Sequence, residues 1–464
     1  MGRRRSEPEP RSVPTAVALA LVLLVAACGG PSPSPTPAAT VAASPGASPS
    51  ARSASPVASP EPTSSGPGQS IGTTGAVVLL TNDGSLSMVD AAGRSFIVAS
   101  AGDGNFGFPT WSPDGSQIAA PRTLGTNKSV VVFDAKAVVA GRSVEPVVIF
   151  QSATIDPFYL FWTPDGKAVS FLASESSELS LRIAPADGTA PLDGSGPGAK
   201  VRTGNPFYYD WIARDRLLAH VGLGTDAFLG EMRLDGKAAG ASLGKPGDFR
   251  SAVVSHDRKS IAFVRDGGTG PGQIVVAARD GSEEHTMEVF GSAAVIFDPA
   301  GDTLAAIGAA EPVPPAGFPL GPLRLMEAGS GKVRTLIDGL VVSFWWSPDG
   351  KTIAALRVQE VVGSGLPSPG QPSAEPSSEV RLVFVDVATG TTRSQPVVKL
   401  GSNFVNGILA FFDQYALSHR AWAPDSSSFL LPESEPDGST HVTVRFPDGQ
   451  PPILLDGELG FWSP

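Results

Sequence analysis

The chain has a single cysteine among its 464 residues, which excludes an intramolecular disulfide and a metal site built from cysteines. Its five histidines are scattered, and none lies at i+2 or i+4 from another, so they offer no zinc-binding spacing. The formal net charge is -11, and the basic patch that nucleic-acid binding requires is missing. We therefore expect no cofactor, no metal and no nucleic-acid partner.

Long amphipathic helices are missing as well. After position 75, no stretch of about 12 residues repeats its apolar side chains every 3.6 residues. The chain is instead rich in turn-forming residues, with 53 glycines and 44 prolines, while charged residues make up 17%. This composition is typical of short strands joined by turns. It predicts an all-β fold.

The N-terminus carries the longest apolar run. Arg3, Arg4 and Arg5 precede an apolar segment at residues 13–27, and this order of a basic and then an apolar region is typical of a secretory signal. The segment is too short to span a membrane comfortably, because a spanning helix takes about 20 residues. It ends in Leu-Val-Ala-Ala-Cys, and the cysteine is Cys28.

This ending resembles the bacterial lipobox, in which the cysteine is diacylated and becomes the new N-terminus. The resemblance implies that residues 1–27 are a lipoprotein signal peptide and that acyl chains on Cys28 anchor the protein to the bacterial membrane, outside the cytoplasm. An ordinary signal peptide with an incidental cysteine is the alternative. Residues 28–74 then form a tether, which we expect to be disordered because Pro, Ser, Ala and Thr supply too little apolar bulk to fold.

Residues 75–464 repeat one pattern. Its clearest copy is Trp-Ser-Pro-Asp-Gly-Lys-Thr-Ile-Ala-Ala-Leu at residues 346–356: an aromatic residue ends one strand, a tight turn follows, and an apolar strand begins. We call the residue before each turn the lock. The locks are Trp111, Trp162, Trp211, Val254, Phe297, Trp346, Trp422 and Trp462. Most intervals between them are about 43–51 residues, the period of a four-stranded propeller blade.

The pattern resembles the TolB-like family of WD-repeat-like β-propellers. The resemblance covers roughly residues 75–464 and implies a β-propeller of four-stranded blades. It implies little about activity, because such propellers serve as binders, scaffolds and enzyme subdomains.

The two ends of the repeated region complement each other. The final Phe-Trp-Ser-Pro is half a copy with no second strand, and the first folded segment has three strands without an innermost one. A composite blade of N- and C-terminal strands would close the ring and leave no open sheet edge. We favour eight blades; seven result if Trp211 or Val254 does not begin a blade.

Aromatic and acidic residues gather shortly before the locks, on the face of the ring that we expect to lie opposite the turns. All four tyrosines are there, interleaved with carboxylates. Tyrosine is favoured in recognition sites because it joins an apolar ring to a polar tip. The predicted ligand-binding residues are Tyr159, Tyr208, Tyr209, Tyr415, Asp156, Asp210 and Asp413. The alternative is that the aromatic rings wedge neighbouring blades together.

No set of residues in the sequence converges on a catalytic site. We therefore expect a membrane-anchored, monomeric propeller that binds a protein, a glycan or a small molecule at the propeller mouth without catalysis. An enzymatic role stays open: a hydrolase or lyase acting on extracellular glycans would use Asp156, Asp210 and Asp413, and would need paired carboxylates about 5–9 Å apart. A third alternative is an envelope scaffold that only organises its neighbours.

Overall fold

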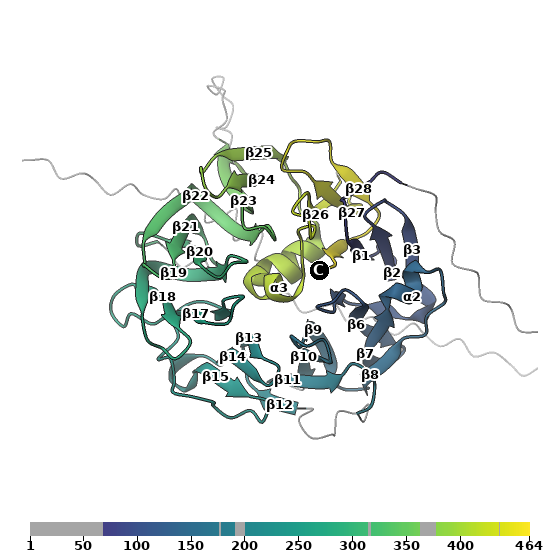
Figure 1. The fold of residues 1–464 in the computed structure, drawn as a ribbon, viewed down its shortest axis with the longest axis horizontal. Helices are drawn as coiled ribbons and strands as arrows, with labels where there is room; N and C mark the ends of the chain where they lie inside the picture. Colours follow the sequence, from purple (N-terminus) through teal and green to yellow (C-terminus); the bar gives the residue numbers. More distant parts are fainter. Residues whose placement is uncertain (1–67, 176–177, 191–199, 314–316, 362–376, 436) are drawn as a thin grey trace, which may run out of the picture.

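The computed structural model describes residues 68–464 except 176–177, 191–199, 314–316, 362–376 and 436. Figure 1 shows the antiparallel sheets arranged around a central axis, with a short helix close to that axis. The predicted signal peptide, Cys28 and the tether as far as residue 67 lie outside the described residues.

The unit of the fold is a four-stranded antiparallel sheet, and the third blade shows it clearly. From the axis outward its strands are β9 (Asp156–Trp162), β10 (Ala168–Glu175), β11 (Glu178–Pro185) and β12 (Lys200–Thr203). The turn after Trp162 forms as the sequence predicts. Gly166 N donates to Thr163 O at 2.9 Å, and Lys167 N donates to Asp165 Oδ1 at 3.2 Å. Gly166 has φ +67°, a conformation that glycine adopts without steric strain.

The sheets before and after this blade vary in strand number. Blade 1 contains β29 (Leu459–Trp462), β1 (Ala76–Leu80), β2 (Leu86–Asp90) and β3 (Ser95–Ala99). Blade 2 contains β4 (Asn105–Phe106), β5 (Thr110–Trp111), β6 (Gln117–Leu124), β7 (Asn127–Asp134) and β8 (Val147–Ser152). Blade 4 contains β13 (Phe207–Ala213), β14 (Arg216–Val221) and β15 (Phe228–Arg233). Blade 8 contains β26 (Phe429–Ser434), β27 (Thr440–Arg445) and β28 (Ile453–Leu455).

A ten-stranded sheet lies between blades 4 and 8. Its strands are β16 (Val253–Val254), β17 (Ser260–Arg265), β18 (Gly272–Ala278), β19 (His285–Phe297), β20 (Thr303–Ala309), β21 (Gly321–Glu327), β22 (Val333–Trp346), β23 (Thr352–Val361), β24 (Ser377–Asp386) and β25 (Thr392–Val397).

Two long strands of this sheet each serve two blades. Residues 285–289 of β19 pair with β18, whereas residues 294–297 pair with β20. In β22, residues 333–337 pair with β21, and residues 340–346 pair with β23. The ten strands therefore form three blades (5, 6 and 7), which with the five other sheets give eight blades in the described residues. This confirms the favoured count.

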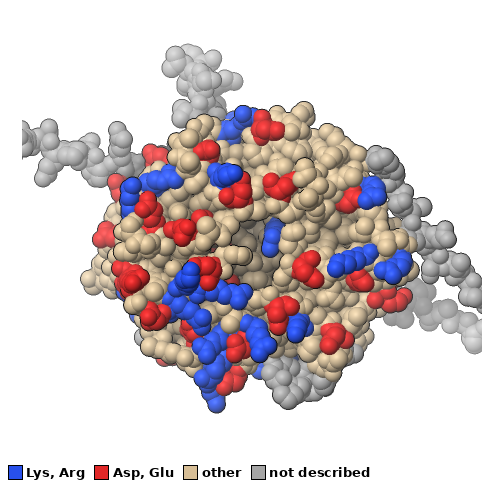
Figure 2. Space-filling view, in the orientation of Figure 1, with Lys and Arg blue, Asp and Glu red and all other residues tan. Residues whose placement is uncertain are grey.

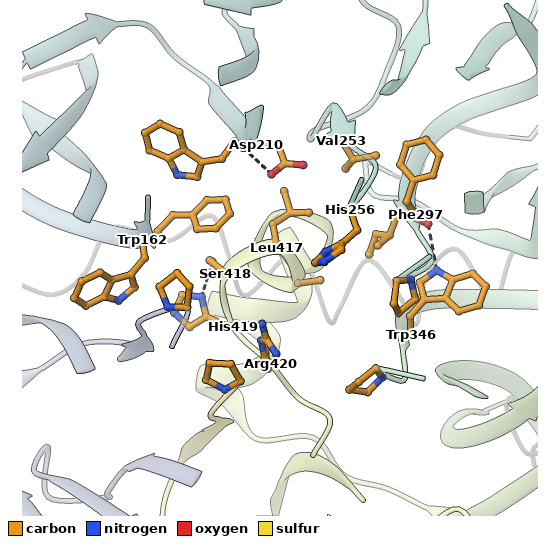
Figure 3. Close-up of a pocket in the computed structure, with 18 of the residues that line it drawn as sticks. Trp162, Asp210, Val253, His256, Phe297, Trp346, Leu417, Ser418, His419 and Arg420 are labelled. Carbon is orange, nitrogen blue, oxygen red and sulfur yellow. Dashed lines mark hydrogen bonds between the residues drawn. The ribbon is translucent and has the colours of Figure 1, made fainter. Parts of the chain in front are cut away.

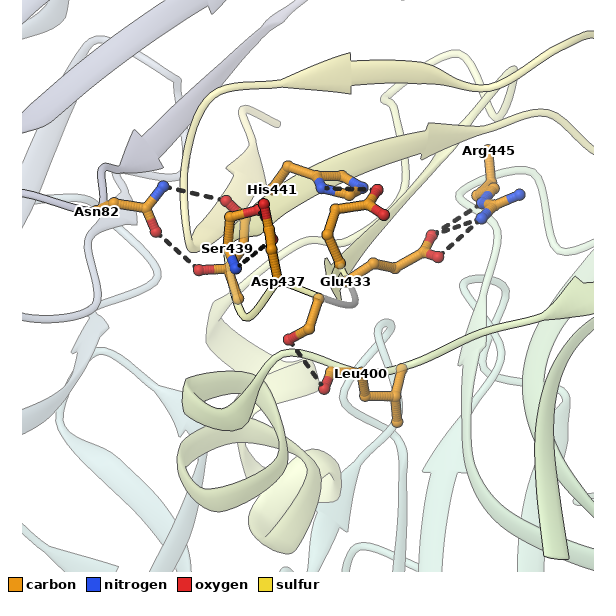
Figure 4. Close-up of polar contacts among 10 residues, drawn as sticks. Asn82, Leu400, Glu433, Asp437, Ser439, His441 and Arg445 are labelled. Carbon is orange, nitrogen blue, oxygen red and sulfur yellow. Dashed lines mark hydrogen bonds and ion pairs between the residues drawn. The ribbon is translucent and has the colours of Figure 1, made fainter.

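The chain ends meet in one sheet, as predicted. Strand β29 pairs antiparallel with β1, from Val77 opposite Trp462 to Leu80 opposite Leu459. The neighbouring seam with blade 8 is held by Asn82 and Thr440: Asn82 Nδ2 donates to Thr440 O at 3.0 Å, and Thr440 Oγ1 donates to Asn82 Oδ1 at 2.7 Å (Figure 4). The composite blade therefore joins the N-terminal and C-terminal strands in one sheet, and hydrogen bonds connect it to blade 8.

The packed part of the chain begins earlier than residue 75. Ile71 N donates to Ala91 O at 3.0 Å, and Ser428 Oγ donates to Ile71 O at 3.0 Å. Ile71 is fully buried among apolar side chains of blades 1 and 8, which include Val77 and Leu430. The burial of Ile71 and the hydrogen bonds of its neighbours, such as Thr73 N to Asp425 Oδ2 at 2.8 Å, attach residues 68–74 to the propeller.

Helical segments are short in the described residues. They are η1 (Ala101–Asp103), α2 (Ala135–Val139), η2 (Gly224–Asp226), the π-helical η3 (Phe404–Ile408), η4 (Leu409–Phe411) and α3 (Phe412–Ser418). Within that part of the chain, none combines the length and the apolar composition needed to cross a bilayer.

Candidate functional site

Four of the six lock tryptophans join neighbouring blades through their indole nitrogens, whereas the buried Nε1 atoms of Trp211 and Trp462 have no hydrogen-bond partner among the described residues. In each of the four, Nε1 donates to the carbonyl of the residue that directly precedes the lock of the previous blade. The bonds run from Trp111 to Phe461 O (3.0 Å), Trp162 to Thr110 O (3.2 Å), Trp346 to Ile296 O (3.2 Å) and Trp422 to Trp345 O (3.0 Å). The repeated motif therefore builds contacts between blades as well as a turn within each blade.

The same locks surround a cavity at the centre of the ring, of about 790 Å³. All seven tryptophans of the chain line it. Around them stand the prolines of the turns: Pro113, Pro164, Pro299, Pro348 and Pro464. Figure 3 shows Trp162 and Trp346 on opposite sides of the cavity. Its walls are thus mainly rings, and they belong to the face of the propeller that carries the turns.

Residues 404–418, which we call the plug, fill the channel behind this cavity. The ring of Phe412 packs against Trp345, with centroids 5.8 Å apart, and the ring of Tyr415 packs against Tyr159 at 5.2 Å. Tyr159 Oη also donates to Gln414 O at 2.9 Å. The plug ends at the cavity, where Leu417, Ser418, His419 and Arg420 form part of its lining (Figure 3).

The cavity lies on another face than the one that the sequence suggested. The aromatic and acidic residues before the locks predicted a site on the face opposite the turns, and that prediction stays untested. The plug fills the channel, and the cavity described above lies at the turn end. The apolar residues Phe404, Ile408, Phe412 and Tyr415 recur at helical spacing, so the expectation of no such stretch after position 75 was wrong for these residues.

Three of the four predicted tyrosines are packed inside the protein. Tyr159, Tyr209 and Tyr415 are 4%, 0% and 8% exposed. The rings of Tyr159 and Tyr209 meet edge to face at 5.7 Å, and burial raises the pKa of Tyr209 above its ordinary value. These contacts agree with the alternative that the rings wedge blades together. Tyr208 is half-buried beside His220. A ligand-binding role for the four tyrosines stays a prediction.

The three predicted carboxylates do not meet in one place. Asp156 is exposed and forms an ion pair with Lys128 at 3.5 Å. Asp413 is buried in the plug, where its Oδ2 accepts a hydrogen bond from Ser251 N at 3.1 Å. Only Asp210 of the three lines the cavity.

The carboxylate of Asp210 is bound by backbone amides. Its Oδ1 accepts from Trp211 N at 2.7 Å, and its Oδ2 accepts from Val254 N at 2.8 Å. Burial raises the pKa of Asp210 to about 6 despite these donors. The side chain therefore connects the innermost strands of blades 4 and 5.

A serine and a histidine lie in contact on the floor of the cavity. Ser418 Oγ and His419 Nδ1 are 2.7 Å apart. Burial lowers the pKa of His419 to about 3, so the imidazole is neutral and a weak base at physiological pH. A general base works best when its pKa lies near the operating pH. The pair is therefore poorly suited to nucleophilic catalysis.

The described residues hold no group of three or more His, Cys, Asp or Glu side chains that could bind a metal ion. Beyond Asp210 and His419, the charged or titratable lining residues are His256, Arg258, Asp298 and Arg420, which sequence reasoning had not singled out. In Figure 2 acidic and basic side chains alternate around the rim of the molecule, and basic surface is visible beside the hollow at its centre.

Comparisons with known proteins do not identify a family or a function for this chain. No protein-family description matches the chain, and no curated protein matches it. Solved structures that are similar include a prolyl endopeptidase (TM-score 0.49, 11% identity, covering 75% of this chain and 49% of that one). Another is the dihydro-heme d1 dehydrogenase NirN (0.49, 14%, 84% and 73%). A third is TolB from Acinetobacter baumannii (0.34, 16%, 70% and 64%).

Proposed function

We propose that this protein is a membrane-anchored, extracytoplasmic propeller that binds a partner molecule in the cavity on its turn face, without chemistry of its own. The observation that carries the proposal is the preformed cavity of about 790 Å³, walled by all seven tryptophans. Binding sites for small molecules are typically concave, mostly apolar and about 300–1,000 Å³ in volume. The cavity has this size and this kind of wall.

The polar groups in the cavity support binding rather than catalysis. Its two carboxylates, Asp210 and Asp298, both accept hydrogen bonds from backbone amides. Hydrolysis of a glycan would need two carboxyl groups free to act on the substrate as acid and base or nucleophile. Turnover of an extracellular glycan, abolished by Asp210→Asn, would favour the hydrolase or lyase alternative.

The anchor in this proposal is the lipidated Cys28, which rests on the lipobox resemblance of the sequence. Cys28→Ala removes the only thiol that could be acylated. We expect this variant to appear in the medium or in the soluble extracytoplasmic fraction, while the parent stays with the membrane. Unchanged membrane association of the variant would contradict the lipid anchor.

Photo-crosslinking in intact cells tests the cavity directly. A benzoylphenylalanine at Leu417, which lines the cavity, should form an adduct with whatever is bound there. The matched control is Leu454, on β28 at the outer edge of blade 8 and 60% exposed. We expect an adduct that is specific to Leu417, and its mass separates a small molecule or glycan from a protein. Protein adducts from Leu454 alone would favour the scaffold alternative.

A further inference from the structure

We propose that the cavity ligand carries a carboxylate and that the guanidinium of Arg420 receives it. This inference rests on the proposed binding function of the cavity and names the chemical class of the ligand. The observation behind it is that the guanidinium of Arg420 has no partner in the protein.

Arg420 is held at the floor of the cavity by its backbone. It follows the plug by two residues, and its carbonyl accepts a hydrogen bond from Trp462 N at 2.8 Å. This bond fixes the residue between blade 8 and the composite blade 1, next to two locks. The side chain extends into the cavity (Figure 3). Its position therefore depends on ring closure and on the plug together.

The guanidinium of Arg420 lacks a counterion. Among the described residues no carboxylate lies within 4.0 Å of it, and its nitrogens form no hydrogen bond with the protein. The side chain of Arg445, by contrast, is largely buried and forms an ion pair with Glu433 at 2.7 Å (Figure 4). The surrounding protein lowers the pKa of Arg420 by desolvation, although a guanidinium stays protonated in proteins. An unpaired guanidinium that lines a cavity favours the binding of an anion from solvent.

The remaining charges of the cavity leave this cation uncompensated. Asp210 is bound to the amides of Trp211 and Val254, and Asp298 Oδ1 accepts from Thr303 N at 2.9 Å. A second guanidinium, that of Arg258, also lines the cavity and favours the ionised form of Asp210. The oxygens of both carboxylates thus already accept hydrogen bonds from backbone amides, and neither carboxylate is paired with Arg420, which is left free to meet an acidic ligand.

The shape of the donor and the nature of the walls favour a carboxylate on an apolar body. A planar guanidinium can bind both oxygens of a carboxylate at once. A phosphate monoester carries close to two charges, and only the guanidinium of Arg420 is left to meet them, because Arg258 interacts electrostatically with Asp210. Indole and proline rings around the floor would contact an apolar or aromatic body. We therefore assign the ligand to organic monocarboxylates.

Tryptophan emission provides the assay, because every tryptophan of the chain lines the cavity. The probes are N-acetylphenylalanine and its amide, which differ in charge and share the apolar body. We expect a saturable change in emission with the acid and binding of the amide that is about 10- to 100-fold weaker. Arg420→Gln should weaken binding of the acid by the same factor. Arg214→Gln removes a charge from an exposed turn outside the cavity and should leave it unchanged.

Two results would overturn the inference. Equal binding of acid and amide, in the parent and in Arg420→Gln, would show that the cavity does not distinguish a charged ligand from a neutral one. The proposed binding function would then still stand. If the emission of the parent shows no saturable response to the acid, the carboxylate inference is also overturned. The proposed binding function of the cavity is tested separately, by crosslinking from Leu417. Should Arg420→Gln fail to fold, Arg420→Lys keeps the charge without the planar fork and should still weaken binding several-fold.

Discussion

Two lock tryptophans allow the indole hydrogen bond between blades to be measured. Trp422 and Trp462 belong to the neighbouring blades 8 and 1, are 3% and 0% exposed, and both line the cavity. They differ in one respect. Trp422 Nε1 donates to Trp345 O at 3.0 Å, whereas the buried Nε1 of Trp462 has no hydrogen-bond partner among the described residues. Each is to be replaced by phenylalanine.

The substitution removes a similar part of the ring at both positions, so the lost packing nearly cancels in the comparison. Trp422→Phe also removes a hydrogen bond and leaves an acceptor unpaired, which destabilises the protein by about 1–2 kcal/mol. Trp462→Phe removes a buried donor that had no partner, so it loses no hydrogen bond, and removing the unpaired donor is neutral or stabilising. We expect the free energy of unfolding of Trp422→Phe to be about 2 kcal/mol lower than that of Trp462→Phe.

Thermal unfolding followed by circular dichroism is a suitable measurement. For a domain of this size the entropy of unfolding is roughly 0.8 kcal/mol/K, so 2 kcal/mol corresponds to about 2–3 °C in Tm. Both variants must be scanned at one rate and one protein concentration. Trp111→Phe serves as a second bonded case, because its Nε1 donates to Phe461 O at 3.0 Å. Equal midpoints for the three variants, or a larger loss at Trp462, would refute the proposed contribution of the indole bonds.

Two further predictions concern buried polar groups. Because the pKa of Asp210 is raised to about 6, the native state binds a proton there more tightly than the unfolded chain does, and its contribution to stability falls as pH rises from about 4 to about 6. Asp210→Asn should remove this pH dependence of stability. The unfolding free energy of the variant, relative to that of the parent, should therefore rise between about pH 4 and about pH 6, by at most about 3 kcal/mol. A difference that does not change with pH would contradict the raised pKa of Asp210. Tyr159→Phe removes the bond to Gln414 O and should lower stability by about 1 kcal/mol. Amide exchange at residues 404–418 should then become faster than in β27, and unchanged protection there would argue against a role of Tyr159 in seating the plug.

Much of the fold was predictable because its signals are local. The turn after each lock depends on residues that stand next to one another, such as Thr163, Asp165 and Gly166. The composite blade followed from the unpaired half-motif at the C-terminus, whose Trp462 does pair with Val77. The lock positions followed from the repeat spacing, and the indoles of Trp111, Trp162, Trp346 and Trp422 donate hydrogen bonds between blades.

The site was harder to predict because it depends on contacts between distant segments. Whether Tyr159 faces solvent is decided by Tyr415, which lies far away in the sequence and packs against it at 5.2 Å. Arg420 carries no local motif; its significance appears only once ring closure places Trp462 beside it. Two of the predicted tyrosines, Tyr159 and Tyr415, are thus packed against each other at the plug.

The plug also explains why an eight-bladed ring can hold a small ligand. Helix α3 lies close to the centre of the ring (Figure 1), and its Phe412 and Tyr415 pack against Phe344 and Tyr159 of the surrounding blades, so the space between the inner strands is occupied along part of its length. A channel open at both ends would stay hydrated throughout, and a cation in it would interact weakly with an anion. With one end filled, the cavity has a floor, and Arg420 is part of that floor. Closing the channel therefore strengthens the attraction on which the proposed carboxylate recognition depends.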